Sequence, residues 1–163
     1  MPLTALFLFQ LTALSYALIG GVFLAFSDFI MRALARTSGY GGAEAMQHIN
    51  IEVFRWVFMT LFLGLVPASL ALAIYSATML SGISATLGIL ASALYLIGCF
   101  GVTAACNVPL NEKLKAMDST SRETLSFWDK SYVPNWTFWN SVRTTACLFA
   151  ALMLLTAVAL SVS

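Results

Sequence analysis

The chain has 163 residues, of which 60% are apolar and only 9% are charged, and its net charge is +1. Soluble domains carry about 25% charged residues, so the composition excludes an ordinary water-soluble fold, and the small net charge implies no nucleic-acid partner. The eight basic and seven acidic side chains all lie in two stretches, Asp28–Arg55 and Glu112–Arg143. This pattern predicts a membrane bundle whose charges gather at one end.

Four apolar stretches approach the roughly 20 residues that a helix needs to cross a bilayer. They are Leu3–Phe26, Phe58–Leu80, Ile83–Ala105 and Ala146–Val162, the last extending N-terminally through Trp136–Thr145. Backbone groups in lipid must pair within their own segment, which favours helices. The sequence therefore predicts an all-α, integral membrane four-helix bundle, a single domain over residues 1–163 with short cytoplasmic helices in its loops.

The first apolar stretch is longer than the core of a secretory signal peptide and no Lys or Arg precedes it, so we expect a retained helix. It should continue past Phe26 to about Ala35, where the glycine-rich run Thr37–Gly42 breaks it. The second helix is predicted to begin near Ala43 and to run to Leu80.

All eight Lys and Arg residues fall on the side where spans 1 and 3 end and spans 2 and 4 begin. The positive-inside rule places that side in the cytoplasm. Both termini and the turn at Ser81–Gly82 then face outward, and the expected location is a bacterial inner membrane.

The second charged stretch is predicted to hold two short helices, Leu110–Met117 and Ser121–Lys130, with Thr120 and Glu123 at capping-box spacing. Six aromatic residues crowd its C-terminal end: Phe127, Trp128, Tyr132, Trp136, Phe138 and Trp139. They form either an interfacial belt or, in part, the wall of a pocket for a flat aromatic ligand. The three cysteines, Cys99, Cys106 and Cys147, include no C-x-x-C pair, which favours packing residues over disulfide exchange.

Every helix brings amides or charges to the same depth at the charged end. The candidates are Gln47, His48, Asn50, Asn107, Asn111, Trp136, Asn140 and Arg143. Amides at this depth are costly unless they are paired, and an arginine so close to an apolar run usually faces the bundle interior. We therefore predict a polar pocket rather than scattered helix caps.

His48 is the only histidine, which excludes a bis-histidine haem site and a di-iron carboxylate site. No recognised zinc spacing is present, so no metal ligands are predicted, although a bound metal is left open. His48 is either an exposed interfacial side chain or a general base.

Four runs occur in a fixed order: Gly20–Ser27, Ala45–Asn50, Asn107–Asn111 and Trp136–Arg143. Together they resemble the anthrone oxygenase family, small membrane proteins catalogued in bacteria as a domain of unknown function. The resemblance covers roughly residues 15–150. Members often carry a second asparagine followed by proline where this chain has Arg55 and Trp56.

The resemblance implies oxidation of an anthrone to an anthraquinone by O2 as co-substrate, without a bound redox cofactor. Three residues would then be catalytic: Arg143 holding the enolate oxygen, His48 as base with Asp28 or Glu52 behind it, and Asn50. The substrate-binding residues would be Gln47, Asn107, Asn111, Trp136 and Asn140, with Trp136 stacking on the rings.

A noncatalytic membrane subunit, or a lipid- or quinone-binding module, is the alternative function, and a metal-dependent oxidase using His48 is a third. An enclosed pocket of roughly 300–1,000 Å³ among the polar helix ends would favour the enzyme, whereas a flat apolar flank matched to a second chain would favour the subunit. The expected partners are the lipid bilayer and a hydrophobic aromatic small molecule, and homo-oligomerisation is left open.

Overall fold

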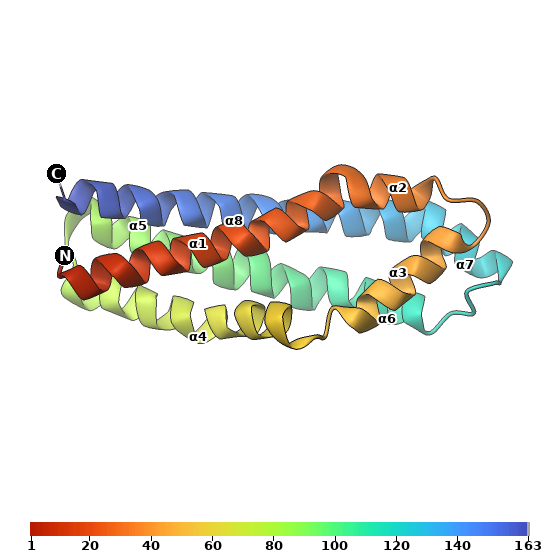
Figure 1. The fold of residues 1–163 in the computed structure, drawn as a ribbon, viewed down its shortest axis with the longest axis horizontal. Coiled ribbons are helices and arrows are strands. Elements are labelled where there is room, and N and C mark those ends of the chain that lie inside the picture. Colours follow the sequence, from red (N-terminus) through yellow and green to blue (C-terminus); the bar gives the residue numbers. More distant parts are fainter. Residues whose placement is uncertain (163) are drawn as a thin grey trace.

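The computed structural model describes residues 1–162, which form long helices lying side by side and no β-strand (Figure 1). Four helical segments are long and apolar enough to cross a membrane. They are Leu3–Ala35, Trp56–Met79, Gly82–Lys115 and Arg122–Ser161. The predicted all-α membrane bundle with four spans is therefore confirmed.

Each segment is built from shorter elements. The first consists of α1 (Leu3–Ala25), the π-helical η1 (Phe26–Ile30) and α2 (Met31–Ala35), and the separate α3 (Gly41–Glu52) leads to α4 (Trp56–Met79). The third consists of α5 (Gly82–Ala93), η2 (Leu94–Gly101), η3 (Thr103–Asn107) and α6 (Val108–Lys115). The fourth consists of α7 (Arg122–Phe127), η4 (Trp128–Tyr132) and α8 (Val133–Val162).

The two ends of the bundle differ in composition. Both chain ends and the turn between α4 and α5 lie at one end, and α2, α3, α6 and α7 lie at the other (Figure 1). Gly82 forms the α4–α5 turn with φ +64°, a backbone conformation that glycine adopts without steric cost. Because both charged stretches lie on the far side of the bundle from this turn, one end carries no charged side chain, as predicted.

The prediction of one unbroken helix from Ala43 to Leu80 is wrong. The helix ends after Glu52 in two i→i−3 hydrogen bonds, from the Phe54 N–H to the Ile51 carbonyl and from the Arg55 N–H to the Glu52 carbonyl, and Arg55 is extended with ψ 155°. The break lets α3 pack its buried face, including Met46 and Asn50, against the other helices of the charged end. Tertiary packing thus overrides the helix propensity of this segment.

The two short helices predicted in the second charged stretch are also not separate. α6 continues the third span and α7 continues through η4 into α8. The capping residue is Ser121, whose Oγ accepts a hydrogen bond of 3.1 Å from the Thr124 N–H, and not Thr120 as predicted. Asp118 accepts two hydrogen bonds from Thr120 in the preceding turn, which lower the pKa of its carboxyl.

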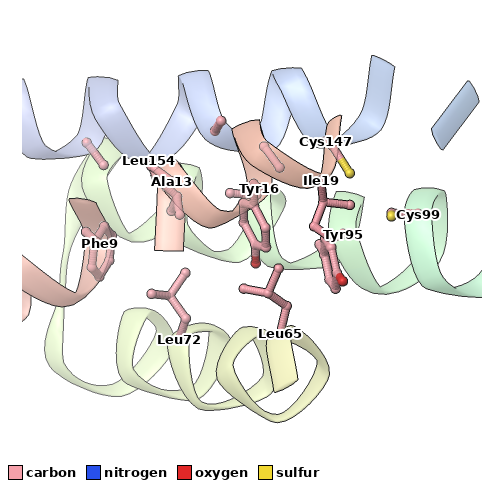
Figure 2. Packing of buried hydrophobic residues seen from close by; sticks show 14 of the residues in the cluster. Phe9, Ala13, Tyr16, Ile19, Leu65, Leu72, Tyr95, Cys99, Cys147 and Leu154 are labelled. Carbon is pink, nitrogen blue, oxygen red and sulfur yellow. The ribbon is translucent and has the colours of Figure 1, made fainter. Parts of the chain in front are cut away.

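The membrane core is tightly packed around α8 (Figure 2). Tyr16 of α1 and Tyr95 of η2 stack with ring centres 4.8 Å apart. Their hydroxyls are satisfied inside the bundle, by Ser69 Oγ at 2.6 Å and by the Phe62 carbonyl at 2.6 Å, as polar groups in lipid must be. Cys99 and Cys147 are fully buried in the same cluster, which agrees with their predicted role as packing residues.

Candidate functional site

A second buried cluster assembles the charged end of the bundle. Trp128, Tyr132 and Trp136 are stacked in sequence, with ring centres 5.3 and 6.3 Å apart. They are buried together with Met31, Ala43, Met46 and Leu114, which come from α2, α3 and α6. This cluster fixes α3 over the ends of the spans. Three of the six crowded aromatic residues are thus structural parts of the interior rather than a membrane belt.

A cavity of about 120 Å³ lies between this aromatic cluster and the membrane core. Its apolar wall comes mainly from α1, α3 and α4 and includes Phe23, Phe26, Phe58, Phe62 and Trp136. Its polar wall is formed by Asn50, Thr103, Asn111, Glu112 and Arg143. The cavity is therefore aromatic on one side and hydrogen bonding on the other.

Arg143 is the most unusual side chain of the cavity, because it is 5% exposed and has no acidic partner. The salt bridge found within residues 1–162 joins Arg55 to Glu52, the last residue of α3, and does not involve Arg143. Arg143 lies 18 residues before Ser161, about 27 Å along the helix, which is close to the full thickness of a hydrocarbon core of about 30 Å. A cation is thus held at the border of the membrane interior.

Neutral groups hold the guanidinium of Arg143. Nη2 donates to Asn140 Oδ1 at 2.6 Å, and Nη1 donates to Thr103 Oγ1 at 3.2 Å. The guanidinium carbon lies 4.1 Å from the ring centre of Phe23 and 5.4 Å from that of Trp136, which is cation–π distance. Nε is buried and has no partner within the described residues. Arg143 therefore faces the cavity without a carboxylate in salt-bridge contact.

Asn140 supports Arg143 from behind and does not line the cavity. It is fully buried, and its Nδ2 donates to the Phe23 carbonyl and to Ser27 Oγ, both at 2.6 Å. These bonds tie α8 to the junction of α1 and η1. The same amide thus joins two spans and fixes the arginine with its remaining oxygen.

Asn111 organises the opposite wall. Its Oδ1 accepts hydrogen bonds of 2.8 Å from both Tyr132 OH and Trp136 Nε1. Asn50 Nδ2 approaches the same tyrosine hydroxyl at 3.3 Å. The Trp136 ring is consequently fixed in orientation beside the cavity.

The remaining predicted site residues do not reach the cavity wall. Gln47 donates to the carbonyls of Leu114 and Met117 at 2.7 and 3.0 Å, at the C-terminal end of α6. Asn107 is buried, donates to the Trp136 carbonyl at 3.2 Å, and leaves its Oδ1 without a partner in the described chain. His48 is exposed on α3 and does not line the cavity. The two carboxylates expected behind it, Asp28 and Glu52, are exposed as well.

Phe23, Thr103 and Glu112 also line the cavity, and none of them is among the site residues predicted from the sequence. Thr103 begins η3, and the supporting residue Ser27 lies in η1. Segments of π-helix are frequent at functional sites, and here they occur near the charged end in three of the four spans. Their extra residue per turn changes which side chains face the interior, so an ideal helical spacing could not identify these positions.

The cavity is smaller than the pocket of roughly 300–1,000 Å³ that would favour an enzyme. A cavity of about 150 Å³ holds one benzene ring, so 120 Å³ has room for about one ring of a flat molecule. The cavity is not closed, because Phe54, which is 70% exposed, lies on its rim at the junction of α3 and α4. A larger ligand would therefore extend past this rim or displace it.

Outside the cavity an apolar groove follows α1 and α4. One part, of about 610 Å³, includes Leu11, Gly64 and Leu65, and a second part, of about 630 Å³, includes Leu18 and Trp56. Val22 and Phe58 line both the second part and the cavity. The groove thus reaches the cavity wall along the membrane-facing side of the bundle.

The sequence profile of the anthrone oxygenase family matches residues 52–153, which is more than half of the chain. The chain belongs to the anthrone oxygenase family. Neither a curated protein nor a solved structure matches it. The family match covers Thr103, Asn111, Trp136, Asn140 and Arg143, so the family region carries the arginine together with the residues that hold it.

Proposed function

We propose that this member of the anthrone oxygenase family is a membrane-embedded, cofactor-independent oxygenase. Its substrate would be a hydrophobic, enolisable aromatic of the anthrone class, which O2 oxidises to the quinone. One observation carries the proposal: a buried arginine without a salt-bridge partner faces a cavity whose other walls are mainly aromatic rings and amides, with one carboxylate, Glu112. Such a site suits a flat molecule that becomes an anion during the reaction.

The chemistry requires little from the protein. The methylene group opposite the anthrone carbonyl is acidic, because its anion is an aromatic enolate, and such electron-rich anions react with O2 directly. One anthrone and one O2 give one anthraquinone and one water. Arg143 would stabilise the enolate oxygen, as positioned donors stabilise oxyanions in other enzymes. Asn50 and Asn111 would place the substrate, and Trp136 and Phe23 would contact its rings.

The residues of the site supply no obvious metal centre. Residues 1–162 bring no three His, Cys, Asp or Glu side chains together in an arrangement that could hold a metal ion. We therefore propose a reaction that uses O2 as co-substrate and no bound metal. Treatment with a chelator tests this part of the proposal.

An anthrone partitions into lipid, and the groove between α1 and α4 gives it a route to the cavity. We propose that the substrate enters along this groove past Val22 and Phe58. The first ring would occupy the cavity beside Arg143, and the remaining rings would extend toward the rim at Phe54.

The eight basic residues favour an orientation with the charged end in the cytoplasm and both termini outside, and we propose a bacterial inner membrane as the location. In this orientation the cavity lies at the cytoplasmic border of the bilayer. Product could then leave to either the membrane or the cytoplasm.

Oxygen uptake by the purified protein in lipid vesicles tests the function. We expect anthrone-dependent uptake with one anthraquinone formed per O2, unchanged by chelator and at least about 100-fold slower in Arg143→Met. Loss of uptake on chelation would contradict the cofactor-free mechanism. Saturable anthraquinone binding without any O2 uptake would instead support the alternative, a noncatalytic quinone-binding module.

A further inference from the structure

The proposed reaction needs a base inside the cavity, and the structure offers one candidate that the sequence did not suggest. Of the charged residues and the histidine within residues 1–162, two line the cavity, Arg143 and Glu112. Arginine cannot accept a proton at neutral pH. Glu112 is therefore the ionisable side chain of the wall that can act as a proton acceptor.

The other candidates lie elsewhere. His48, Asp28 and Glu52 are exposed and outside the cavity wall, and Glu52 pairs with Arg55 at 3.4 Å. Tyr132 OH lies behind the wall, where it donates to Asn111 Oδ1. A general base must reach the proton that it removes, directly or through one water, and none of these groups borders the space where substrate would lie.

We propose that Glu112 is the general base of the reaction, an inference that rests on the proposed function. The Glu112 carboxylate takes one proton from the anthrone methylene, and the electron pair of that C–H bond moves into the rings and onto the oxygen beside Arg143. The enolate carbon then bonds to O2, and the protonated Glu112 returns its proton to the terminal peroxide oxygen. The Glu112 carboxylate then removes the second C–H proton, the electron pair of that bond forms the C=O bond, and the O–O bond breaks to release hydroxide. The proton and the hydroxide combine to water, which leaves with the finished quinone.

The position of Glu112 suits a proton carrier. It lines the same cavity as Trp136, whose Nε1 donates to the neighbouring Asn111 at 2.8 Å, so a substrate stacked on that ring would share the cavity with Glu112. The Glu112 side chain is exposed as well as cavity-lining, and it can exchange protons with water while the substrate remains among apolar side chains.

No cation is paired with Glu112 within the described chain. Lys113 lies on the same helix, but its ammonium is 4.5 Å from the ring centre of Phe127. Lys115 is exposed on the same helix, and α3, which packs against α6, contributes Glu44, His48 and Glu52 on exposed positions. Arg143 is the charge that shares the cavity with it. The two groups can therefore act together on one substrate, the acid–base group on carbon and the cation on oxygen.

Hydrogen–deuterium exchange separates this step from oxidation. Anthrone is incubated without O2 in D2O with the protein in lipid vesicles, and loss of the methylene signal is followed by NMR. We expect the wild type to accelerate exchange above empty vesicles, and Glu112→Gln to slow it by about 100-fold or more, the range of general-base catalysis. Glu112→Asp should restore part of the rate, and Glu123→Gln, which changes a surface carboxylate of α7, should leave it unaltered.

Each outcome is decisive. Wild-type rates in Glu112→Gln, or a loss of exchange in His48→Gln with none in Glu112→Gln, would overturn the assignment. An absence of protein-accelerated exchange in the wild type would overturn it too. Exchange that depends on Glu112 without any O2 uptake in air would sustain the base and refute the oxygenase function. Anthraquinone binding to Glu112→Gln shows that a slow variant is still folded around its cavity.

Discussion

The guanidinium carbon of Arg143 lies 4.1 Å from the centre of the Phe23 ring, across the interface between α8 and α1. This contact places a cation on an aromatic face at the edge of the membrane interior, where a carboxylate partner would normally be expected. Phe23 also presents its backbone carbonyl to Asn140. One residue of α1 therefore meets both the charge and the amide that holds it.

The unpaired charge of Arg143 predicts a separation of stability from function. Replacing a buried ion by an apolar side chain of similar length is often neutral or stabilising, while the freed Asn140 Oδ1 costs about 1–3 kcal/mol. The free energy of unfolding of Arg143→Met should accordingly lie within about 2 kcal/mol of the wild-type value, although the variant loses anthrone oxidation. Unfolding in mixed detergent micelles, measured beside oxygen uptake, checks both halves. A variant that does not fold would show that the arginine is structural.

Asn140 should matter more for folding than Arg143 does. Asn140→Ala leaves the Phe23 carbonyl, Ser27 Oγ and the arginine without their shared partner, which should destabilise the protein by about 2–4 kcal/mol. Asn135→Ala is the matched control, because that amide is exposed and bonds only the Ser131 carbonyl of its own turn. Equal stability of the two variants would show that the Asn140 hydrogen bonds contribute little.

Gln47 is expected to act on α6 and not on substrate. Gln47→Leu removes the two hydrogen bonds to the carbonyls of Leu114 and Met117 and should lower stability by about 1–2 kcal/mol. The KM for anthrone should stay within about twofold of wild type, because the amide does not border the cavity. A large rise in KM with unchanged stability would restore the substrate-binding role that the sequence suggested.

Entry of substrate along the groove predicts a position-dependent effect on α4. A side chain at Gly64 would project into open space, since an added Cβ meets no atom within 4 Å, so Gly64→Trp should obstruct the groove. We expect kcat/KM in vesicles to fall several-fold with kcat at saturation near wild type. Leu63→Trp, at the neighbouring position that is 52% exposed and outside the groove, is the control. Equal effects of the two tryptophans would argue against this route.

The sequence predicted the spans well because their signal is long and nearly independent of tertiary contacts. Arg143, Asn50, Asn111 and Trp136 could also be found, since polar groups next to apolar runs are costly unless they face a common interior. The break at Val53–Arg55 could not be predicted, because the sequence is helical on both sides of it. The chain turns there only because the buried face of α3 packs against the other helices of the charged end.

The position of His48 could not be predicted from its chemistry. Histidine is chemically suited to act as a base, but on α3 this side chain is exposed, whereas Met46 and Asn50 of the same helix are buried. In the sequence, Glu112 is one charge among several in the second charged stretch. Only the packing of α6 against α3 shows which of these two side chains borders the cavity.

Anaerobic titration of anthrone into the protein in lipid vesicles tests the central claim most directly. If Arg143 stabilises the enolate, wild-type protein should bind anthrone with the visible absorption of its anion at a pH where free anthrone remains neutral, and admission of O2 should convert that absorption to the quinone spectrum. Arg143→Met should bind anthrone without the anion absorption. Equal anion absorption in the wild type and in Arg143→Met, or its absence from both, would contradict the account.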